Sequence, residues 1–288
     1  MNFNKVFQKT FPVLKKVFNF FILLIIFLFA IFLSWYFTVE PTYSHDYNPL
    51  YQKLPEVSFS GSIVTVHNVR SFLHADKESY IQDYYDATFD LNTIRSIDYI
   101  LIPFTDSKFK AHAMLSFGFE DGTYITISPE GMREKGEEYS LFKTIFRQLE
   151  LSYLIVDEKD ALTLRAFSRG NLVYLYPLVL PKESMKILAE DMFVRAEELS
   201  HRPTWYSLLR DACATSVIQH IQKSLQKNDT LLGLRVFIPI FSDKYLYDNH
   251  LVDTSRSFSE TKEGALIDEK IRQNIENDFD FSKKIRKI

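Results

Sequence analysis

The single cysteine of the chain, Cys213, is the first residue whose type suits covalent chemistry. It lies in PTWYSLLRDACATSVIQHI, whose apolar spacing predicts a helix from about 205 to 227. A thiol in the first half of a helix has its thiolate stabilised by the helix dipole. Cys213 is therefore a candidate nucleophile, and the alternative role is that of a small buried apolar residue.

A catalytic thiol needs a base within hydrogen-bond reach. His220 shares a helix face with Cys213, but seven residues of helix rise about 10.5 Å, which is too far for direct proton transfer. The other histidines are His45, His67, His74, His112, His201 and His250. His112 is the best candidate because it opens the alternating run 111–119, and a strand places a side chain rigidly. Its alternative role is a strand-edge histidine with a local hydrogen bond, and His67 is the second candidate.

Other charged clusters have a simpler interpretation. The segment 128–140 is read as a solvated loop entering a helix, and it carries Glu130, Arg133, Glu134, Lys135, Glu137 and Glu138. Asp157, Glu158 and Asp160 are predicted to form a polar hairpin turn. The sequence has no GxSxG, P-loop, GxGxxG or HExxH motif, so we expect neither a cofactor nor a metal.

The elements that position these residues are predicted to be strands in the first half of the chain beyond residue 61. Alternating or β-branched runs predict strands over 62–69, 97–104, 111–119, 123–128, 152–157, 161–167 and 171–180. Asp121-Gly122 is a strong turn signal between two of them. Residues 138–149 have helical spacing, while 77–86 fit either a short helix or irregular structure.

The second half is predicted to be helical. Residues 181–199 form an amphipathic pattern that precedes the helix of Cys213, and 231–241 looks like a strand that returns to the sheet. The charged segment 254–288 is predicted to be a surface helix or a frayed tail, with binding to acidic lipid headgroups as a weaker option. Strands followed by helices around one core predict an α+β domain, built on an antiparallel sheet with packed helices.

An uncharged run of 23 residues, 17–39, precedes this domain. It is long enough to cross a bilayer, and Trp35 and Tyr36 stand at its outer end. Four lysines come before it, which predicts a cytoplasmic N-terminus over 1–16. The competing reading is a cleaved signal peptide, but the run is longer than such a region and SWYFTVEP offers no small-x-small cleavage site. Residues 40–61 contain three prolines and are predicted to be a linker.

Charge and cysteine content exclude several classes of protein. The chain has 288 residues and a net charge of −3, which splits into +4 over residues 1–39 and −7 beyond them. This balance gives no electrostatic footprint for nucleic acid. One cysteine excludes an intramolecular disulfide framework and any cysteine-based structural zinc site.

The exported part resembles the periplasmic domain of the Lnb-type lipoprotein N-acyltransferases. The resemblance runs from about Ile63 to Leu251, and its markers in chain order are VHNVRSF (66–72), YYDATFDL (84–91), the block 111–140, LSYLIVDEKDALTLR (151–165), VYLYPL (173–178), PTWYSLLRDACATSVIQHI (203–221) and IPIFSDKYLYDNHLVD (238–253). The shared order is more specific than any one motif. The family looks like a relative of the circularly permuted papain-like thiol enzymes, which include lecithin:retinol acyltransferase.

The resemblance implies a permuted papain-like domain over 62–253 with Cys213 as nucleophile and His112 as base. In that arrangement the strand histidine precedes the helix cysteine, as it does here. Ser128 and Glu130 are the candidates for the orienting residue, and Glu130 is preferred. One position departs from the family pattern, because Ala212 replaces the asparagine that usually precedes the cysteine.

The expected reaction is acyl transfer or hydrolysis through a thioester on Cys213. Backbone N–H groups at the start of the helix would stabilise the oxyanion. A membrane tether concentrates the domain at the same surface as a lipid or lipoprotein substrate. We therefore expect a single-pass protein of the bacterial inner membrane whose main domain is periplasmic. The alternatives are a thiol amidohydrolase that acts on cell-wall peptide and a non-catalytic membrane-anchored binding or scaffold domain.

Overall fold

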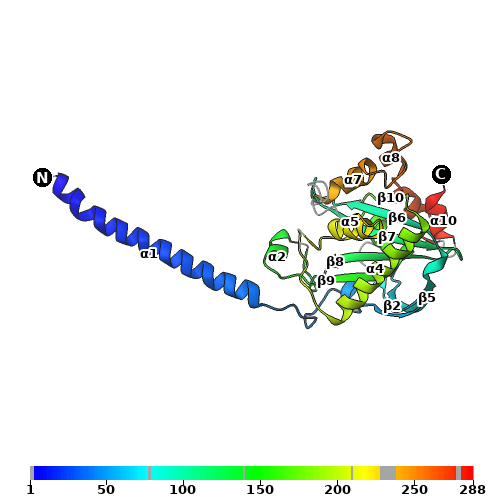
Figure 1. Ribbon diagram of the computed structural model, residues 1–288, viewed down its shortest axis with the longest axis horizontal. Helices are drawn as coiled ribbons and strands as arrows, with labels where there is room; N and C mark the ends of the chain where they lie inside the picture. The colour runs from blue at the N-terminus through cyan, green and yellow to red at the C-terminus, as the bar shows by residue number, and fades with distance from the viewer. Residues whose placement is uncertain are drawn as a thin grey trace. The chain divides into compact units, whose positions relative to one another are not determined.

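The computed structural model describes residues 3–76, 79–138, 140–208, 210–227, 238–276 and 280–287. They belong to two units, one that ends at Pro41 and one that begins at Thr42. The first unit is helix α1 (Phe3–Thr38), shown in blue in Figure 1. Its stretch Leu14–Thr38 has a mean hydropathy of 2.9 and is long and apolar enough to cross a membrane. The predicted N-terminal apolar helix is thus present.

A mixed sheet forms the centre of the second unit. Among the described residues it has eight strands, in the order β1 (Glu56–Ser60), β2 (Ile63–Arg70), β9 (Leu151–Asp157), β8 (Tyr124–Gly131), β7 (Ala111–Phe119), β6 (Ile94–Pro103) and β10 (Tyr174–Pro177), with β5 (Tyr84–Asp90) paired to β2 outside this path. A separate pair joins β3 (Leu73–His74) and β4 (Tyr80–Ile81). Two short 3-10 turns, η1 (Pro49–Tyr51) and η2 (Leu91–Thr93), precede β1 and β6.

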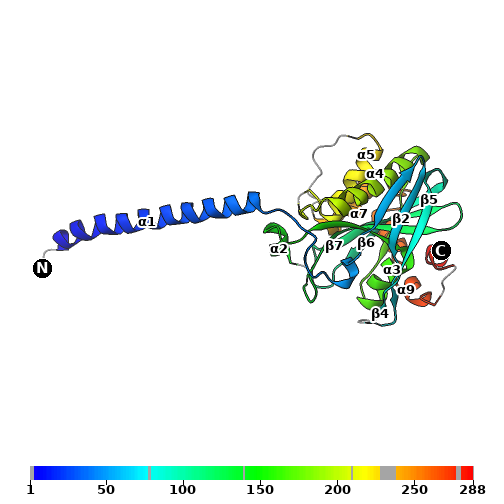
Figure 2. The ribbon, with the colours of Figure 1, turned by 90° about the horizontal axis from the view of Figure 1, so that it is seen from below.

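Helices cover both faces of this sheet (Figure 2). One face carries α4 (Lys182–His201) and α5 (Cys213–Ser224), and the other carries α3 (Glu158–Thr163) and the π-helical turn η3 (Leu164–Ser168). Neighbouring strand residues point to opposite faces. Ala113 and Leu115 of β7 accordingly pack in the cluster with α4 and α5, and Met114 packs in the cluster with α3.

The hairpin of β7 and β8 confirms the strongest turn signal in the sequence. Gly122 adopts φ +92°, a left-handed conformation that glycine tolerates without strain. The Gly122 amide donates a hydrogen bond to the Phe119 carbonyl at 3.0 Å. The predicted strands over 62–69, 97–104 and 152–157 are also present, as β2, β6 and β9.

Two strand predictions need correction. The sheet is mixed rather than antiparallel, because β2 pairs with β9 in parallel at Arg70 and Val156. Residues 161–167 are helical rather than extended. The Asp157 carboxylate accepts a hydrogen bond from the Lys159 amide at 2.9 Å and so caps the start of α3. The Asp157–Asp160 segment is therefore a helix start and not a hairpin turn.

Two predicted helices are present, but the structure begins one of them later than the sequence suggested. The predicted helix over 181–199 is α4, and the one over 205–227 begins only at Cys213. Residues 138–149 contain a single short helix, α2 (Leu141–Ile145). Most of the predicted strand over 231–241 lies outside the described residues, and its described end is a 3-10 turn, η4 (Pro239–Phe241), rather than a strand. Within the ambiguous segment 77–86, the described residues form β4 and the start of β5.

The two segments expected to lie outside the domain core pack against it. In the predicted linker 40–61, Tyr47, Leu50 and Tyr51 are buried. The charged segment after residue 253 follows α7 (Ser242–Asp248) and forms three short helices, α8 (Phe258–Gly264), α9 (Asp268–Gln273) and α10 (Phe281–Arg286).

The segment 254–288 is thus not a frayed tail over its described residues. Its apolar side chains Ile271 and Ile285 are fully buried. Arg286 donates to Asp98 at 2.7 Å and to Glu158 at 2.5 Å, which joins α10 to β6 and α3. Such a paired buried charge is costly to break, by about 3–5 kcal/mol when one partner is removed.

Candidate functional site

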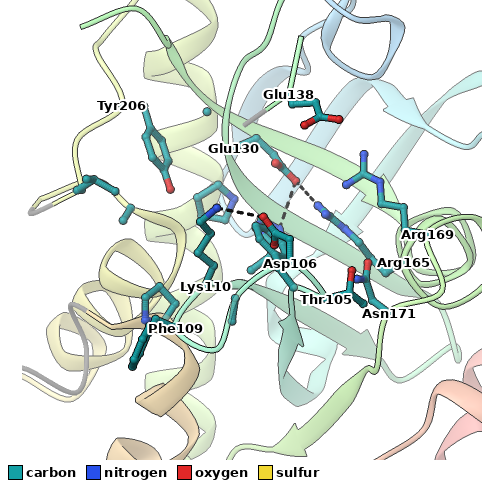
Figure 3. A pocket seen from close by; sticks show the side chains of 18 of the residues that line it. Thr105, Asp106, Phe109, Lys110, Glu130, Glu138, Arg165, Arg169, Asn171 and Tyr206 are labelled. Atoms are coloured by element: carbon teal, nitrogen blue, oxygen red, sulfur yellow. Dashed lines mark hydrogen bonds and ion pairs between the residues drawn. The ribbon is translucent and has the colours of Figure 1, made fainter. Parts of the chain in front are cut away.

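The strands β7 and β8 separate at the end of the sheet that carries His112. Their ladder runs from Gly118 opposite Tyr124 to Leu115 opposite Ile127, whereas β7 extends back to Ala111 and β8 extends on to Gly131. A cavity of about 630 Å³ lies at this end (Figure 3). His112, Glu130 and Ala212 contribute to its wall. The cavity therefore meets both the strand hairpin and the residue before Cys213.

His112 is held by a buried polar cluster on the α3 side of the sheet. Its Nε2 lies 2.8 Å from the Ser128 hydroxyl and 3.2 Å from Glu130 Oε1. The Ser128 hydroxyl donates to the same Glu130 oxygen at 3.0 Å. Arg165 of η3 donates to this oxygen at 2.8 Å. The order of the strands thus assembles an imidazole, a hydroxyl, a carboxylate and a guanidinium.

The electrostatics of this cluster keep the imidazole neutral. Burial lowers the pKa of His112 to about 3, against the attraction of the Glu130 carboxylate. Burial alone would raise the pKa of Glu130, but His112 and Arg165 outweigh it and lower that pKa to about 2. Because Glu130 is ionised and accepts only, Nε2 carries the proton of the ring. Among the described residues, no hydrogen bond occupies His112 Nδ1, which is the atom available to accept a proton.

Cys213 is the first residue of α5 and lies on the opposite side of β7. Its thiol donates to the Ala111 carbonyl at 3.7 Å, and its amide donates to the Tyr206 hydroxyl at 3.4 Å. Burial raises the pKa of the Cys213 thiol. This effect is larger than that of the nearby backbone N–H groups, which lower the pKa by favouring the thiolate. Ala212 is the N-cap of α5 and provides no side-chain cap.

The structure brings some of the sequence-predicted residues together and leaves others apart. His112 and Glu130 are in contact, with Ser128 between them. Ala111 and Ala113 belong to the α5 side, so alternation places the His112 side chain on the far side of the strand from Cys213. Among the described residues, no hydrogen bond joins the thiol to the imidazole.

The remaining histidine candidates have other partners. His67 pairs with Asp86 at 2.7 Å and is half-exposed on β2. His220 pairs with Asp191 at 2.5 Å and with the Tyr153 hydroxyl at 3.0 Å. The described residues contain no group of three metal-ligating side chains able to hold an ion.

Sequence reasoning missed three arginines of the cavity wall, Arg133, Arg165 and Arg169. The signal for two of them was present. An aspartate followed by acidic residues, as in Asp157-Glu-Lys-Asp160, is typical of a helix start. A helix from that point places Arg165 and Arg169 four residues apart, which puts them on one face. The strand reading of 161–167 hid this spacing.

The fold and the site define a class: an α+β domain in which a buried histidine and carboxylate meet a cavity beside the N-terminus of a helix. Comparison with known families matches residues 80–248 to the Lnb N-terminal periplasmic domain. Because the match covers more than half of the chain, the protein belongs to this family. No curated protein and no solved structure matches the chain. The family and the apolar helix α1 together describe a single-pass membrane protein with a periplasmic domain.

Proposed function

We propose that the domain is a cysteine-dependent acyltransferase or hydrolase that acts on the acyl group of a membrane lipid or lipoprotein. Cys213 is the nucleophile, His112 the base and Glu130 the residue that orients the base, in a permuted papain-like arrangement. The observation that carries the proposal is the state of His112. Its Nε2 is held by Ser128 and Glu130, and its Nδ1 is without a hydrogen bond within the described part of the chain.

In the resting structure the thiol is hydrogen-bonded to the Ala111 carbonyl, and it lies on the other side of β7 from the His112 ring. The sulfur therefore has to leave that carbonyl, and the two groups have to come together, before the Cys213 thiol gives its proton to His112 Nδ1. The thiolate then attacks an ester or amide carbonyl, and the imidazolium returns its proton to the leaving group. An amine acceptor that resolves the thioester gives acyl transfer, and water gives hydrolysis.

The protein groups around the reacting atoms support these steps. A neutral imidazole with a pKa of about 3 and a protonated thiol form an uncharged resting pair, so no ion pair has to be desolvated before the substrate binds. The ionised Glu130 stabilises the imidazolium that forms. The start of α5 is suited to an oxyanion, because the backbone N–H groups of a helix N-terminus favour negative charge.

A second candidate function is a membrane-anchored lipid-binding domain without catalysis. Two observations favour it. Cys213 and His112 point to opposite sides of β7, and Ala212 supplies no polar group beside the thiol. A non-catalytic domain would not need the asparagine that usually stands at the position of Ala212 in the family that the chain resembles.

Turnover by the full chain in detergent tests the proposal. We would incubate it with a diacylated lipopeptide or a phospholipid, and detect released or transferred fatty acid by mass spectrometry. The proposal expects turnover by the wild type and by the control His220→Asn, and none by Cys213→Ala or His112→Asn. Equal turnover by Cys213→Ala overturns it. Lipid binding by the wild type without turnover selects the second candidate, and turnover of cell-wall peptide alone selects an amidohydrolase.

A further inference from the structure

The cavity wall includes the guanidinium of Arg169, which forms no ion pair with a carboxylate of the described residues. It lies at the end of η3, one helical turn beyond Arg165, and its side chain faces the cavity (Figure 3). Within the described part of the chain, no ion pair or side-chain hydrogen bond involves Arg169, although Arg165 is paired with Glu130. The Arg169 side chain is exposed to solvent and lines the cavity.

The surroundings of Arg169 are electrostatically unfavourable without a ligand. Burial among protein atoms, together with repulsion from Arg165 and Arg133, lowers the pKa of Arg169 to about 10. Arg133 shares the cavity wall and donates to the Tyr51 hydroxyl rather than to a carboxylate. Three arginine side chains that lie close together, one of them without a carboxylate partner among the described residues, are typical of a site that binds an anion.

The charges of the cavity wall leave a small positive excess at this end. Lys110 pairs with Asp106 at 3.1 Å, and Arg165 pairs with Glu130 at 2.8 Å. The remaining charged residues of the wall are Arg133, Arg169 and Glu138. Glu138 acts on Arg133 at long range and is exposed. Glu130 attracts Arg169 electrostatically, but within the described part of the chain no carboxylate forms an ion pair with Arg169.

Apolar side chains also line the cavity. They include Phe104, Phe109, Ile238 and Pro239, and the Phe109 side chain is 63% exposed. Figure 3 shows Phe109 on one side of the cavity and Arg165 and Arg169 on the other, with Glu130 between them. A ligand that fills this space needs an apolar arm and an anionic group at its two ends.

The cavity also lies close along the chain to the apolar helix. The Lys135 amide donates to the Asp46 carbonyl, and the Asn48 amide donates to the Arg133 carbonyl, both at 2.9 Å. Helix α1 ends at Thr38, and seven residues, 39–45, separate it from Asp46 along the chain.

We propose that Arg169, together with Arg133, binds the phosphodiester of a glycerophospholipid, whose acyl chain lies against the apolar side chains that include Phe109. A planar guanidinium binds a phosphate through two parallel hydrogen bonds, which a lysine cannot reproduce. Free phosphate would satisfy the arginines but would leave these apolar side chains in water. The inference names the substrate class of the proposed acyl-transfer site, and as a statement about substrate it rests on that proposal.

Binding is measured without turnover, so that the two proposals fail separately. The full chain carrying Cys213→Ala is titrated calorimetrically in non-ionic detergent with dihexanoyl phosphatidylglycerol, dihexanoylglycerol, inorganic phosphate or an anionic cell-wall tetrapeptide. We expect the phospholipid to bind most tightly. Arg169→Gln should weaken its binding by about 10-fold or more and leave dihexanoylglycerol unaffected. Arg169→Lys should restore part of the loss, and the exposed control Arg202→Gln should have no effect.

Three other outcomes overturn the inference. If Arg169→Gln weakens the binding of phospholipid and of dihexanoylglycerol equally, Arg169 only maintains the shape of the cavity. Arg169→Lys serves for the same comparison if the glutamine variant does not fold. Phosphate that binds as tightly as the phospholipid indicates a free-phosphate site. Tighter binding of the tetrapeptide indicates a carboxylate site for cell-wall peptide. Phospholipid binding that depends on Arg169 in an enzyme without turnover supports this inference while it contradicts the proposed catalysis.

Discussion

Two histidine clusters in this domain have the same chemical composition and different surroundings. One joins His112 to Ser128, Glu130 and Arg165, and the other joins His220 to Tyr153, Asp191 and Lys223. Each contains an imidazole, a hydroxyl, a carboxylate and a cation. The first contributes to a cavity of about 630 Å³, whereas the second links α5 to α4 and β9.

The difference lies in the second ring nitrogen. Both nitrogens of His220 have partners, Nδ1 with Asp191 and Nε2 with Tyr153. In His112, Nε2 has partners and Nδ1 has none among the described residues. A base needs an unoccupied nitrogen and room for the group that gives the proton. Composition alone therefore does not distinguish a reactive histidine from one that connects helices.

The largest expected effect is on turnover. His112→Asn should lower the rate of acyl transfer by about 1000-fold or more. The base and the nucleophile act as a unit, so loss of either one removes most of the rate enhancement that they give together. His220→Asn should retain wild-type turnover. Initial rates with a lipid ester substrate measure both. Comparable losses in the two variants would remove the distinction between the clusters.

The next effect is on stability. Glu130→Gln leaves Arg165 buried beside a neutral amide and should lower the free energy of unfolding by about 3 kcal/mol. Asp191→Asn should cost only about 1 kcal/mol, because Lys223 is exposed and an asparagine oxygen can still accept the hydrogen bond of His220. Urea denaturation measures both values. A larger loss for Asp191→Asn would show that the second cluster is the more tightly coupled of the two.

The pH dependence of stability tests whether His112 is neutral in the folded state. Its pKa is lowered to about 3, so between about pH 3 and 6.5 the unfolded chain binds more protons than the folded chain. This contribution to stability is complete above pH 6.5 and is lost as the pH falls, by about 2 kcal/mol at pH 5. His112→Asn should remove that part of the loss between pH 7.5 and 5. Parallel losses in the wild type and the variant would contradict a neutral, buried His112.

The smallest effect concerns the cysteine side of β7. Ala212→Asn places a capping acceptor at the N-cap of α5 and should stabilise the domain by about 1 kcal/mol. In the first turn of the same helix, the buried Thr215 hydroxyl has no hydrogen-bond partner among the residues that the structure describes. Thermal unfolding measures the change, with Ala212→Val as a control that adds volume but no acceptor. Equal effects of the two substitutions would indicate that packing, and not capping, limits this end of α5.

Local patterns were enough to predict the apolar helix, the hairpin that carries His112, and α4. Each of these has a signal within a few residues: a long apolar run, an Asp-Gly turn between alternating strands, and a helical period. The contact between His112 and Glu130 also follows, because adjacent strands bring them together once the hairpin is known.

The parts that could not be predicted depend on tertiary packing. One miss was local: the run ALTLRAF alternates like a strand, and the helix-start signal at Asp157 was read as a hairpin turn, so the arginines of the cavity were missed. The charged C-terminal segment contains few apolar residues, and Arg286 is buried only because Asp98 and Glu158 lie in distant elements. The position of Cys213 relative to His112 depends on where α5 begins and on which face of β7 it packs.

Intact-protein mass spectrometry of the acylated enzyme tests the central claim most directly. After brief exposure of the full chain to a short-chain lipid ester, we predict one added acyl group that hydroxylamine removes, as expected for a thioester. It should be absent from Cys213→Ser, formed much more slowly by His112→Asn, and unchanged in His220→Asn. An adduct of the same amount and hydroxylamine sensitivity in Cys213→Ser would contradict the assignment of Cys213 as the nucleophile.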